Sequence, residues 1–523
     1  MEDLESYPVL LKASAVAVLC ITLTAFLYGV TMNAKRRKLP PGPFPWPIIG
    51  NIPSVGTHPH QTYVDLAKKY GDIFTLYIGS ARLVVVTNAA LAKEVLLVQD
   101  AKFAHRPIYD LMYTCIKYLN PDGDSSFSCG LWGPKAREMR QICDRHFMLP
   151  RRVEATRSSR MEEVWRTVGL IEKQAQAGKP IDLRHQLEEL ALRLSCRSAF
   201  NKAFVGSEKS GDSTLSSDVF WRLGREHSKL LVEQNPSDVI PFLKPLGDVF
   251  GVNKKWQDVY FPFLESSSRL QDWYRKNAPN NADVEDELDL DYLEVLMRKA
   301  KEGSVPESAV NEQNVEVMIA GADTNAVTLE WSLLELLRHP DMMQKLRAEI
   351  DGKFGDSSPV EEESLVELSY LQSVVKETLR LHHPAPLSIP HYNTEDTMIG
   401  GYLIPAGTSI ITDLYAIQRN PADWGEDALE FNPDRFLTKD VNVLGSSDLQ
   451  YLPFSAGRRI CPGRQIAVRG IALTLAALVH AFDWEAIPGH ELSIVEAAGG
   501  LNCRPINALT LRALSRPHVS LYH

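Results

Sequence analysis

Apolar residues recur at three- and four-residue steps over long stretches of this chain, which is the period of a helix with one buried face. These stretches predict helices at Val315–Arg338, Leu365–Leu381 and Ile466–Val479. Shorter runs of β-branched and other apolar residues predict strands, at Phe74–Ile78, Leu83–Val86 and Thr408–Thr412. Because helices dominate and the strands do not alternate with them, the pattern predicts a mainly α fold with a minor β region rather than a doubly wound sheet.

The N-terminus carries an uncharged apolar stretch of membrane-spanning length. Residues 13–30 contain no charge, and a helix extended to residue 32 spans about 30 Å, enough to cross a bilayer core. The basic tetrapeptide at 35–38 follows at once, whereas the first residues are acidic. The positive-inside rule then predicts a transmembrane anchor at 13–32, with residues 1–12 in the lumen and the rest in the cytosol. A cleaved signal peptide would need a basic start, and no convincing cleavage site follows the apolar run.

A basic and proline-rich segment at 33–50 separates this stretch from the rest of the chain. It contains the sequence Leu39-Pro40-Pro41-Gly42-Pro43, in which the prolines fix φ and exclude helix. The segment therefore predicts a stiff hinge that holds a globular body at a set angle to the membrane. Residues 51–523 contain no second linker, repeat or low-complexity tract, and they are expected to form one domain.

Composition and charge narrow the class of protein. Of the 523 residues, 44% are hydrophobic and 23% are charged, which excludes global disorder. The 56 Lys and Arg against 66 Asp and Glu give a net charge of −10, so non-specific nucleic-acid binding is a poor fit. The seven cysteines are odd in number and form no C-x-x-C pair. They argue against a disulfide scaffold and against a Cys-rich zinc module.

The most specific string in the chain is FSAGRRICPG, which runs from Phe454 to Gly463. A cysteine thiolate that ligates iron needs glycines for close backbone approach, a nearby cation, and amide donors aimed at the sulfur. Gly457, Arg459 and Gly463 supply residues of these types around Cys461. The helix expected to follow would place the positive end of its dipole near the sulfur. An isolated cysteine is most often a buried thiol, but this pattern favours a metal ligand.

This loop resembles the haem-ligand loop of cytochrome P-450, the haem-thiolate monooxygenase family. The family pattern F-x-x-G-x-R-x-C-x-G is matched at Phe454, Gly457, Arg459, Cys461 and Gly463. The resemblance implies haem b as the cofactor, with Cys461 as the axial thiolate ligand of the iron. It also implies the cytochrome P-450 fold, with a single catalytic domain behind the N-terminal transmembrane helix. Other family motifs occur in the right order, so the resemblance covers essentially the whole chain.

Two of those motifs imply a buried charge network beneath the haem. The E-x-x-R of the family's K helix is matched at Glu377 and Arg380, and its P-x-R-F segment at Pro433–Phe436. An acid and a base three residues apart share one helix face. A second arginine, Arg435, can satisfy the remaining carboxylate oxygens.

A third motif lies inside the longest predicted helix. The sequence from Ala320 to Thr324, AGADT, resembles the family's oxygen-site motif. The resemblance implies that the helix opens locally over the distal haem face and that Asp323 and Thr324 deliver protons there. Gly321 is costly inside a helix, and the resemblance implies that the small residues leave room for dioxygen. Family members that start from a peroxide often lack the acid–Thr pair, so the motif favours O2 and two electrons.

The resemblance also implies partners and a location. NADPH would supply the electrons through a membrane-bound flavoprotein reductase, which would dock on a basic face. The candidate residues for that face are Arg458, Arg464, Lys135 and Arg145. The hinge and the cysteine loop most resemble microsomal land-plant members, which implies a single-pass protein of the endoplasmic reticulum membrane with a cytosolic catalytic domain.

The same resemblance implies that the substrate is a small lipophilic or aromatic metabolite of plant specialised metabolism. The family's substrate-contacting regions correspond here to Ile108–Asn120, Met318–Ala322, Leu387–Ile389 and Gly500–Asn502. These segments are mostly apolar, which fits a hydrophobic pocket but names no substrate.

One departure from the family pattern concerns the haem propionates. The family's C helix usually carries W-x-x-x-R, and Ala136 occupies the position of the tryptophan ahead of Arg140. Either one propionate donor is missing, or Trp132 reaches in from one turn earlier. Arg140, Arg459 and His391 are then the expected propionate partners.

Three alternatives remain open on the sequence alone. Asn325 stands where the family usually has a second Thr or Ser, and this is similar to the amino-acid N-hydroxylating branch of the plant enzymes. A haem-thiolate isomerase that uses hydroperoxides would turn over without a reductase. A non-catalytic haem protein would bind haem and consume no NADPH with any substrate.

Overall fold

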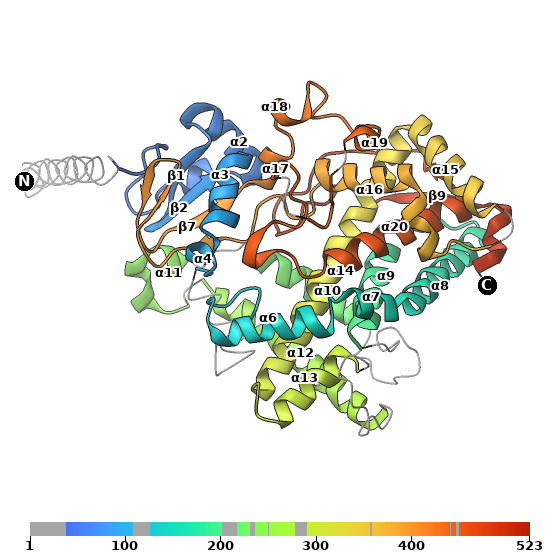
Figure 1. Cartoon of the computed structure of the whole chain (residues 1–523), viewed down its shortest axis with the longest axis horizontal. Helices are drawn as coiled ribbons and strands as arrows, with labels where there is room; N and C mark the ends of the chain where they lie inside the picture. The colour runs from blue at the N-terminus through green and yellow to red at the C-terminus, as the bar shows by residue number, and fades with distance from the viewer. Residues whose placement is uncertain are drawn as a thin grey trace, which may run out of the picture.

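The computed structural model describes residues 38–107, 126–200, 217–230, 236–248, 250–277, 290–355, 358–439, 441–445 and 449–522. Helices dominate this part of the chain (Figure 1). They are α2 (Pro59–Tyr70), α3 (Ala89–Lys93), α4 (Asp100–Phe103), α6 (Pro134–His146), α7 (Pro150–Ala155), α8 (Arg157–Gln176), α9 (Leu183–Phe200), α10 (Ser217–Leu230), α11 (Pro236–Val239), α12 (Val252–Asn277), α13 (Tyr292–Lys301), α14 (Glu307–Arg338), α15 (Pro340–Phe354), α16 (Ser369–Leu381), α17 (Leu414–Ile417), α18 (Pro421–Trp424), α19 (Arg435–Thr438) and α20 (Arg464–Ala481).

The β part consists of small sheets. The strands are β1 (Ile73–Ile78), β2 (Ala81–Val86), β3 (Ile181–Asp182), β4 (His391–Tyr392), β5 (Thr397–Ile399), β6 (Tyr402–Ile404), β7 (Ser409–Thr412), β8 (Phe482–Ala486) and β9 (Thr510–Ser515). One sheet has the order β1-β2-β7-β4, a second has the order β3-β9-β8, and β5 pairs with β6. In the first sheet β2 pairs in parallel with β7, with Leu83 opposite Ser409, although more than three hundred residues separate them.

These elements confirm the mainly α fold with a minor β region. The helices and strands expected from the pattern are all present, and their ends lie within four residues of the predicted ones except at the start of α14. That helix begins at Glu307, eight residues before the predicted Val315. Its first turns are polar, and Glu312, Gln313 and Asn314 are nevertheless buried. Hydrophobic periodicity cannot report a helical face that buries polar side chains, which is why the sequence pattern missed this part.

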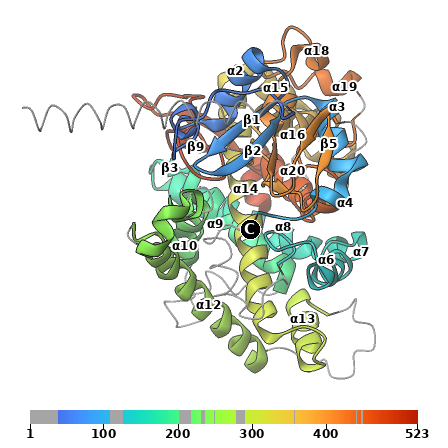
Figure 2. The same cartoon turned by 90° about the vertical axis from the view of Figure 1, so that its left-hand side faces the viewer.

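Helix α14 runs through the middle of the molecule (Figure 2). It packs most extensively against α9, and also contacts α12, α13, α16 and α20. Most of its side chains from Ala309 onward are buried on every side. A helix that is covered all round is held by tertiary packing, so α14 is a fixed wall for any site beside it.

The predicted membrane segment lies outside this description. Residues 1–12 and 13–32, and the first part of the hinge, are not among the described residues. Within the described ranges, the structure contains no helix that is both long and apolar enough to cross a bilayer. The described chain starts beside the sheet that contains β1 and β2, and it ends on the opposite side of the molecule (Figure 1).

Candidate functional site

A cavity of about 390 Å³ separates α14 from the loop that leads into α20. On one side it is lined by Ala320, Gly321 and Thr324, and on the other by Phe454 and Cys461. Most of the other lining residues are apolar, and a few charged side chains gather among them. Concave, mostly apolar sites with a few placed polar groups are the usual form of a cofactor or substrate pocket.

The loop that carries Cys461 is closed by backbone hydrogen bonds. The amide of Cys461 donates to the carbonyl of Phe454 (3.0 Å), and the amide of Ile460 donates to that of Gly457 (3.1 Å). Gly457 has a φ of +72°, and a Cβ there would lie 1.8 Å from the carbonyl oxygen of Leu96. Only glycine fits this position, so the loop shape depends on a contact with a distant part of the chain.

The thiol of Cys461 lies at the start of α20. Gly463 is the N-cap of that helix. Burial raises the pKa of the Cys461 thiol, while the backbone amide of Gly463 and the charges of Arg140 and Arg464 lower it. The net shift is upward, and a bound metal ion would reverse it, because a coordinating thiol is deprotonated outright.

Basic side chains gather on another part of the cavity wall. Arg106, Arg140, His391 and Arg459 all line it. The guanidinium of Arg459 is buried, donates to the carbonyls of Ala104, Phe127 and Gly130, and lies 4.6 Å from the ring centroid of Trp132. The structure therefore brings Trp132 against the expected propionate partner Arg459, while Ala136 is completely buried on α6.

The positive charges of these side chains repel one another and lower one another's pKa. Burial and the nearby Arg459 lower the pKa of Arg106 to about 9, and burial lowers the pKa of Arg459 to about 10. Burial, Arg106 and Arg459 together lower the pKa of His391 to about 3. The carbonyl of Phe103 accepts a hydrogen bond from Nδ1 of His391 (2.8 Å), so the ring carries its proton on Nδ1. An anionic ligand would reduce the repulsion among these basic groups and favour their charged forms.

The cavity therefore fits haem on three counts. It has a cysteine sulfur on one wall and a helix with small residues on the opposite wall. It also has a cluster of buried cations that matches two carboxylates. Of this cluster, the sequence had indicated Arg140, His391 and Arg459 but not Arg106.

The cavity wall also contains two acids that the sequence reasoning missed, Glu312 and Glu316. Oε1 of Glu316 accepts a hydrogen bond from the hydroxyl of Ser128 (2.7 Å) and another from Ser126. Burial raises the pKa of Glu316, and the hydroxyls and Arg459 oppose that shift. Glu316 precedes Ala320 and Thr324 by four and eight residues, so helical spacing places the three on one face. That spacing was the signal that the sequence offered.

Thr324 faces the cavity, and α14 does not open beside it. The helix is continuous from Glu307 to Arg338, contrary to the expectation of a local opening. Oγ1 of Thr324 donates to the carbonyl of Ala320 (2.8 Å), and Nδ2 of Asn325 donates to that of Gly321 (2.8 Å). Asn325 therefore bonds to its own helix in the manner open to Ser and Thr. These side chains add to the backbone ladder without breaking it.

Gly321 lies on the cavity wall and also packs closely against a neighbouring helix. A Cβ on Gly321 would lie 2.3 Å from Oγ of Ser195 and 3.3 Å from its Cβ. Ser195 belongs to α9, the main packing partner of α14. Glycine at this position lets the two helices approach closely.

Asp323 points away from the cavity. Its carboxylate accepts a hydrogen bond from Nδ2 of Asn502 (2.5 Å) and pairs with Arg504, which also bonds to Glu188 (2.8 Å). Asp323 is not among the cavity-lining residues, whereas Thr324 is. Consecutive residues of a helix are about 100° apart, so the acid and the hydroxyl of the motif face different neighbours.

The predicted charge network is assembled at the end of α16. Glu377 and Arg380 are completely buried and form two hydrogen bonds of 2.7 and 2.8 Å. Nε of Arg435 donates to Glu377 (3.0 Å). Arg380 also donates to the carbonyls of Gln418 (2.9 Å) and Ala428 (2.7 Å). The carboxylate and Arg380 are thereby fully engaged, which is the condition under which a buried ion pair persists.

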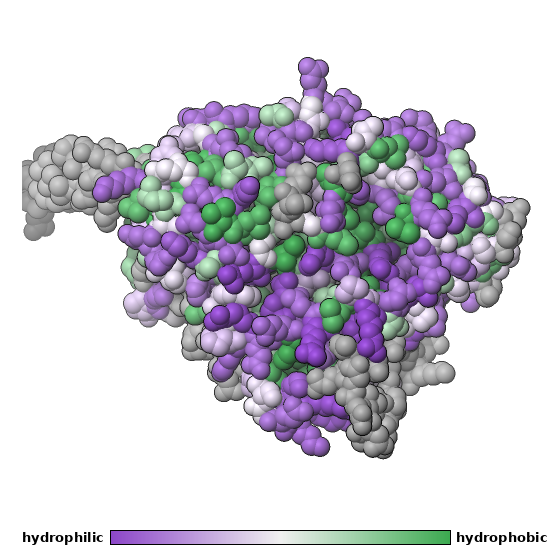
Figure 3. All heavy atoms as spheres, viewed as in Figure 1, coloured by the Kyte–Doolittle hydropathy of each residue, from purple (hydrophilic) through white to green (hydrophobic). Residues whose placement is uncertain are grey.

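A second hollow of about 460 Å³ lies on the surface beside the cysteine loop. Arg140, Asp144, Arg458 and Arg464 line it. The surface over α6 is mostly hydrophilic (Figure 3), and Lys135 and Arg145 are exposed there. The four predicted docking residues thus belong to α6 or to the cysteine loop and the start of α20.

Of the two cysteines in the C-terminal part of the chain, only one faces the cavity. Cys461 lines it, whereas Cys503 lies with His60 and Glu496 and does not. Among the predicted substrate-contacting segments, Leu387–Ile389 contributes all three residues to the cavity wall. Residues Leu501 and Asn502 also contribute. The segment Ile108–Asn120 lies outside the described residues.

The chain is similar to known proteins over nearly its full length. The sequence pattern of the family described as cytochrome P450 matches residues 40–509. A ferruginol synthase of Salvia miltiorrhiza is 32% identical over 92% of this chain and 93% of its own length. Cytochrome P450 750A1 of Pinus taeda is 34% identical over 92% of both chains. A geraniol 8-hydroxylase of Swertia mussotii is 32% identical over 88% of this chain and 91% of its own.

Proposed function

The chain belongs to the cytochrome P450 family and is a monooxygenase, and from this premise we propose that it hydroxylates a small lipophilic or aromatic metabolite of plant specialised metabolism. The oxygen comes from O2, and the electrons come from NADPH through a flavoprotein reductase. The observation that carries the proposal is the apolar cavity that has Cys461 on one wall and Thr324 on the other.

Haem bound in this cavity would supply the oxygen activation, and a cysteine thiolate ligand would donate the electron density that favours O–O cleavage. We assign Cys461 as that ligand, with the amide of Gly463 stabilising the sulfur. Arg106, Arg459 and His391 would hold the haem carboxylates. His391 would do so only after protonation of Nε2, because Nδ1 already donates to a backbone carbonyl. A carboxylate beside it favours that protonation.

The chain supplies protons from α14. The hydroxyl of Thr324 lies on the cavity wall and holds its proton toward the carbonyl of Ala320. Asp323 lies next to it as the acid, and its carboxylate must leave Arg504 and Asn502 and take up a proton from solvent before it can pass that proton toward Thr324. Positioned side chains with water between them are a common route for general acid catalysis.

The relatives guide the choice of substrate. Two of them are a ferruginol synthase and a geraniol 8-hydroxylase. A third, from Nicotiana tabacum, is a 5-epiaristolochene 1,3-dihydroxylase that is 33% identical to this chain. Such lipophilic substrates suit a cavity whose wall is mostly apolar. Terpenoids and simple phenolics are therefore the first compounds to screen.

The membrane location is part of the proposal. The segment 236–246 joins the β1–β2 hairpin through a hydrogen bond of 2.7 Å from the amide of Ser80 to the carbonyl of Val239. Exposed apolar side chains lie on this segment and on the nearby hinge, namely Ile48, Ile49, Phe242 and Leu246. Apolar surface of this kind suits the membrane interface beside an anchor at 13–32. Resistance of the full-length chain to alkaline extraction from microsomes would support the anchor.

The reductase is expected on the hollow beside the cysteine loop. Exposed Lys135 and Arg145 on α6, together with Arg458, give this face a local positive charge on an acidic chain. A basic patch steers an acidic partner toward the surface nearest the ligand loop.

The first experiment is the carbon monoxide difference spectrum of the reduced full-length protein. A strongly red-shifted Soret band shows a thiolate ligand, and Cys461→Ser is expected to abolish it. The matched variant Cys503→Ser is expected to retain it. A band at the position typical of imidazole or thiol ligation in fresh protein overturns the assignment.

The second experiment adds NADPH and a library of terpenoids, phenolics, amino acids and hydroperoxides, with and without reductase. Substrate-dependent NADPH consumption with a hydroxylated product is expected. Turnover of hydroperoxides without reductase points to the isomerase class. Haem binding without NADPH consumption under any substrate points to a non-catalytic haem protein. Hydroxylation of an amino-acid nitrogen points to the amino-acid N-hydroxylating branch, in which an Asn at the position of Asn325 is expected.

A further inference from the structure

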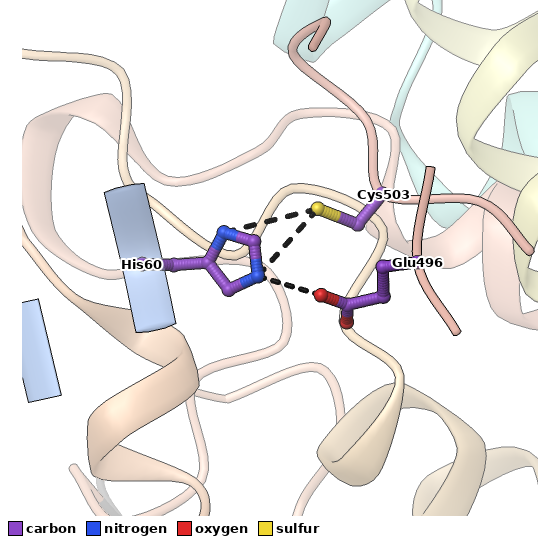
Figure 4. Close-up of side chains that lie close together, drawn as sticks. All are labelled: His60, Glu496 and Cys503. Atoms are coloured by element: carbon purple, nitrogen blue, oxygen red, sulfur yellow. Dashed lines mark hydrogen bonds and ion pairs between the residues drawn. The ribbon is translucent and has the colours of Figure 1, made fainter. Parts of the chain in front are cut away.

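Three metal-ligating side chains converge at a place that does not belong to the haem cavity (Figure 4). His60 is the second residue of α2, whereas Glu496 and Cys503 lie more than four hundred residues later, between β8 and β9. Nε2 of His60 lies 2.7 Å from Oε2 of Glu496 and 3.9 Å from Sγ of Cys503. The three donor atoms all lie within 4.8 Å of one another.

The surroundings hold these side chains in place. His60 and Cys503 are buried, and the side chain of Glu496 is 10% exposed. Nε2 of Gln61 donates to Oε2 of Glu496 (2.8 Å), and the ring of Tyr415 stands edge-on to His60 with centroids 4.8 Å apart. Outer partners that orient ligands in this way are typical of metal sites. The geometry is therefore largely formed before any ion binds.

The chemistry of the three donors suits one class of ion. Imidazole, carboxylate and thiolate together favour Zn²⁺, which takes tetrahedral sites with such mixed ligands. Bonds of about 2.0 Å to nitrogen or oxygen and about 2.3 Å to sulfur place tetrahedral ligand atoms about 3.2–3.7 Å apart. Nε2 of His60 and Oε2 of Glu496 are closer than this and Nε2 of His60 and Sγ of Cys503 are slightly farther, so the three side chains must shift to form the site.

Charge and proton balance are also satisfied. Binding at Nε2 requires that His60 carry its ring proton on Nδ1 instead of on the Nε2 that faces Glu496, and that Cys503 release its thiol proton to solvent. The carboxylate and the thiolate then neutralise the two charges of the ion. The nearby Arg419 donates to the carbonyl of Leu381 and stacks on Tyr415 at 3.6 Å, and its charge helps to lower the pKa of Glu496, so the ion must bind beside one buried cation.

A second cluster of potential metal ligands in the described part of the chain has a feature that disfavours ion binding. Asp351, His480 and His518 also lie within reach of one another. There, however, Arg516 donates to both oxygens of Asp351 (2.6 and 3.1 Å), so a cation already occupies the carboxylate. This cluster provides a matched control for the first one.

We propose that His60, Glu496 and Cys503 bind one Zn²⁺ ion, with water in the fourth position. The ion would tie α2 to the segment between β8 and β9. Leu501 and Asn502 of that segment line the haem cavity, so the ion would stiffen one part of the cavity wall. The site does not depend on the proposed hydroxylase function.

The test measures zinc and iron in the full-length haem-loaded protein. The protein is stripped with a chelator, titrated with Zn²⁺ against a competing indicator, and analysed for both metals. One tightly bound zinc per chain is expected, together with a raised thermal unfolding midpoint. Cys503→Ser and Glu496→Gln are expected to weaken zinc binding at least tenfold, whereas His518→Gln leaves it unchanged. Iron content and the carbon monoxide spectrum report the haem site separately.

Two results would overturn the site. One is a wild-type protein that takes up no zinc, and the other is unchanged zinc affinity in Cys503→Ser. Should a variant lose its haem and fold poorly, Cd²⁺ titration of the wild type decides instead. An ultraviolet thiolate-to-cadmium absorption band that saturates at one equivalent supports the site, and absence of that band rejects it.

Discussion

Replacement of Gly321 by alanine probes the contact that brings α9 and α14 together beside the haem cavity. The added Cβ would lie 2.3 Å from Oγ of Ser195 and 3.3 Å from its Cβ. Real Cβ atoms do not approach a neighbour to 2.3 Å, so the hydroxyl of Ser195 must rotate away. The contact of 3.3 Å between the two Cβ atoms remains after that rotation and requires a small movement of the helices.

Two opposing effects set the size of the change. Alanine is favoured over glycine in a helix interior by about 0.8–1.0 kcal/mol. Overpacking of a well-packed interior costs about 1–3 kcal/mol. Gly321→Ala is therefore expected to lower the free energy of unfolding by between about 0 and 2 kcal/mol, instead of raising it as propensity alone would predict.

A matched background separates the two effects. In Ser195→Gly both close contacts vanish, so the further change Gly321→Ala should stabilise the protein by about 1 kcal/mol. In Ser195→Ala only the contact of 3.3 Å remains, and an intermediate result is expected. Urea unfolding followed by far-ultraviolet circular dichroism, at equal haem content, measures all the variants.

The double-mutant cycle provides the refutation. The packing argument predicts an interaction energy of about 1–3 kcal/mol between positions 195 and 321. An interaction energy below about 0.5 kcal/mol would mean that the two sites act independently. Gly321 would then be required only by the cavity, and the close approach of α9 and α14 would have no energetic weight.

Three further predictions follow from the buried charges. Burial lowers the pKa of His383 to about 4, so the unfolded chain takes up the proton first, and the free energy of unfolding falls as the pH drops below about 6.5. Between pH 7 and 5.5 this loss is about 1 kcal/mol. Urea titrations at the two pH values should not show this loss in His383→Asn. Glu377→Gln leaves Arg380 buried without its partner and should cost about 3–5 kcal/mol in urea unfolding, whereas Lys68→Gln, in an ion pair that is more than 70% exposed, should change stability by less than about 0.5 kcal/mol. Arg459→Gln should speed haem transfer to an acceptor apoprotein at least several-fold, and an unchanged rate would remove this arginine from the proposed haem site.

Local sequence was sufficient wherever a feature is made by neighbouring residues. The helical period identified α16 and α20 within a few residues, because each buries an apolar face that repeats along the chain. The cysteine loop was recognisable for the same reason, since the ten residues from Phe454 to Gly463 contain the glycines, the cation and the thiol together. The acid–base spacing of Glu377 and Arg380 likewise predicted a shared helix face.

Tertiary structure decided which of these groups meet. Asp323 and Thr324 are adjacent in the sequence, yet one faces Arg504 and the other faces the cavity, because helix geometry sends them to different neighbours. Arg106 joins the basic cluster, and His60 meets Cys503, across hundreds of residues. Periodicity reports only that a side chain is buried, whereas its partners depend on how distant elements pack. The sequence alone therefore determined the elements and the ligand loop, and packing determined the electrostatics of the site.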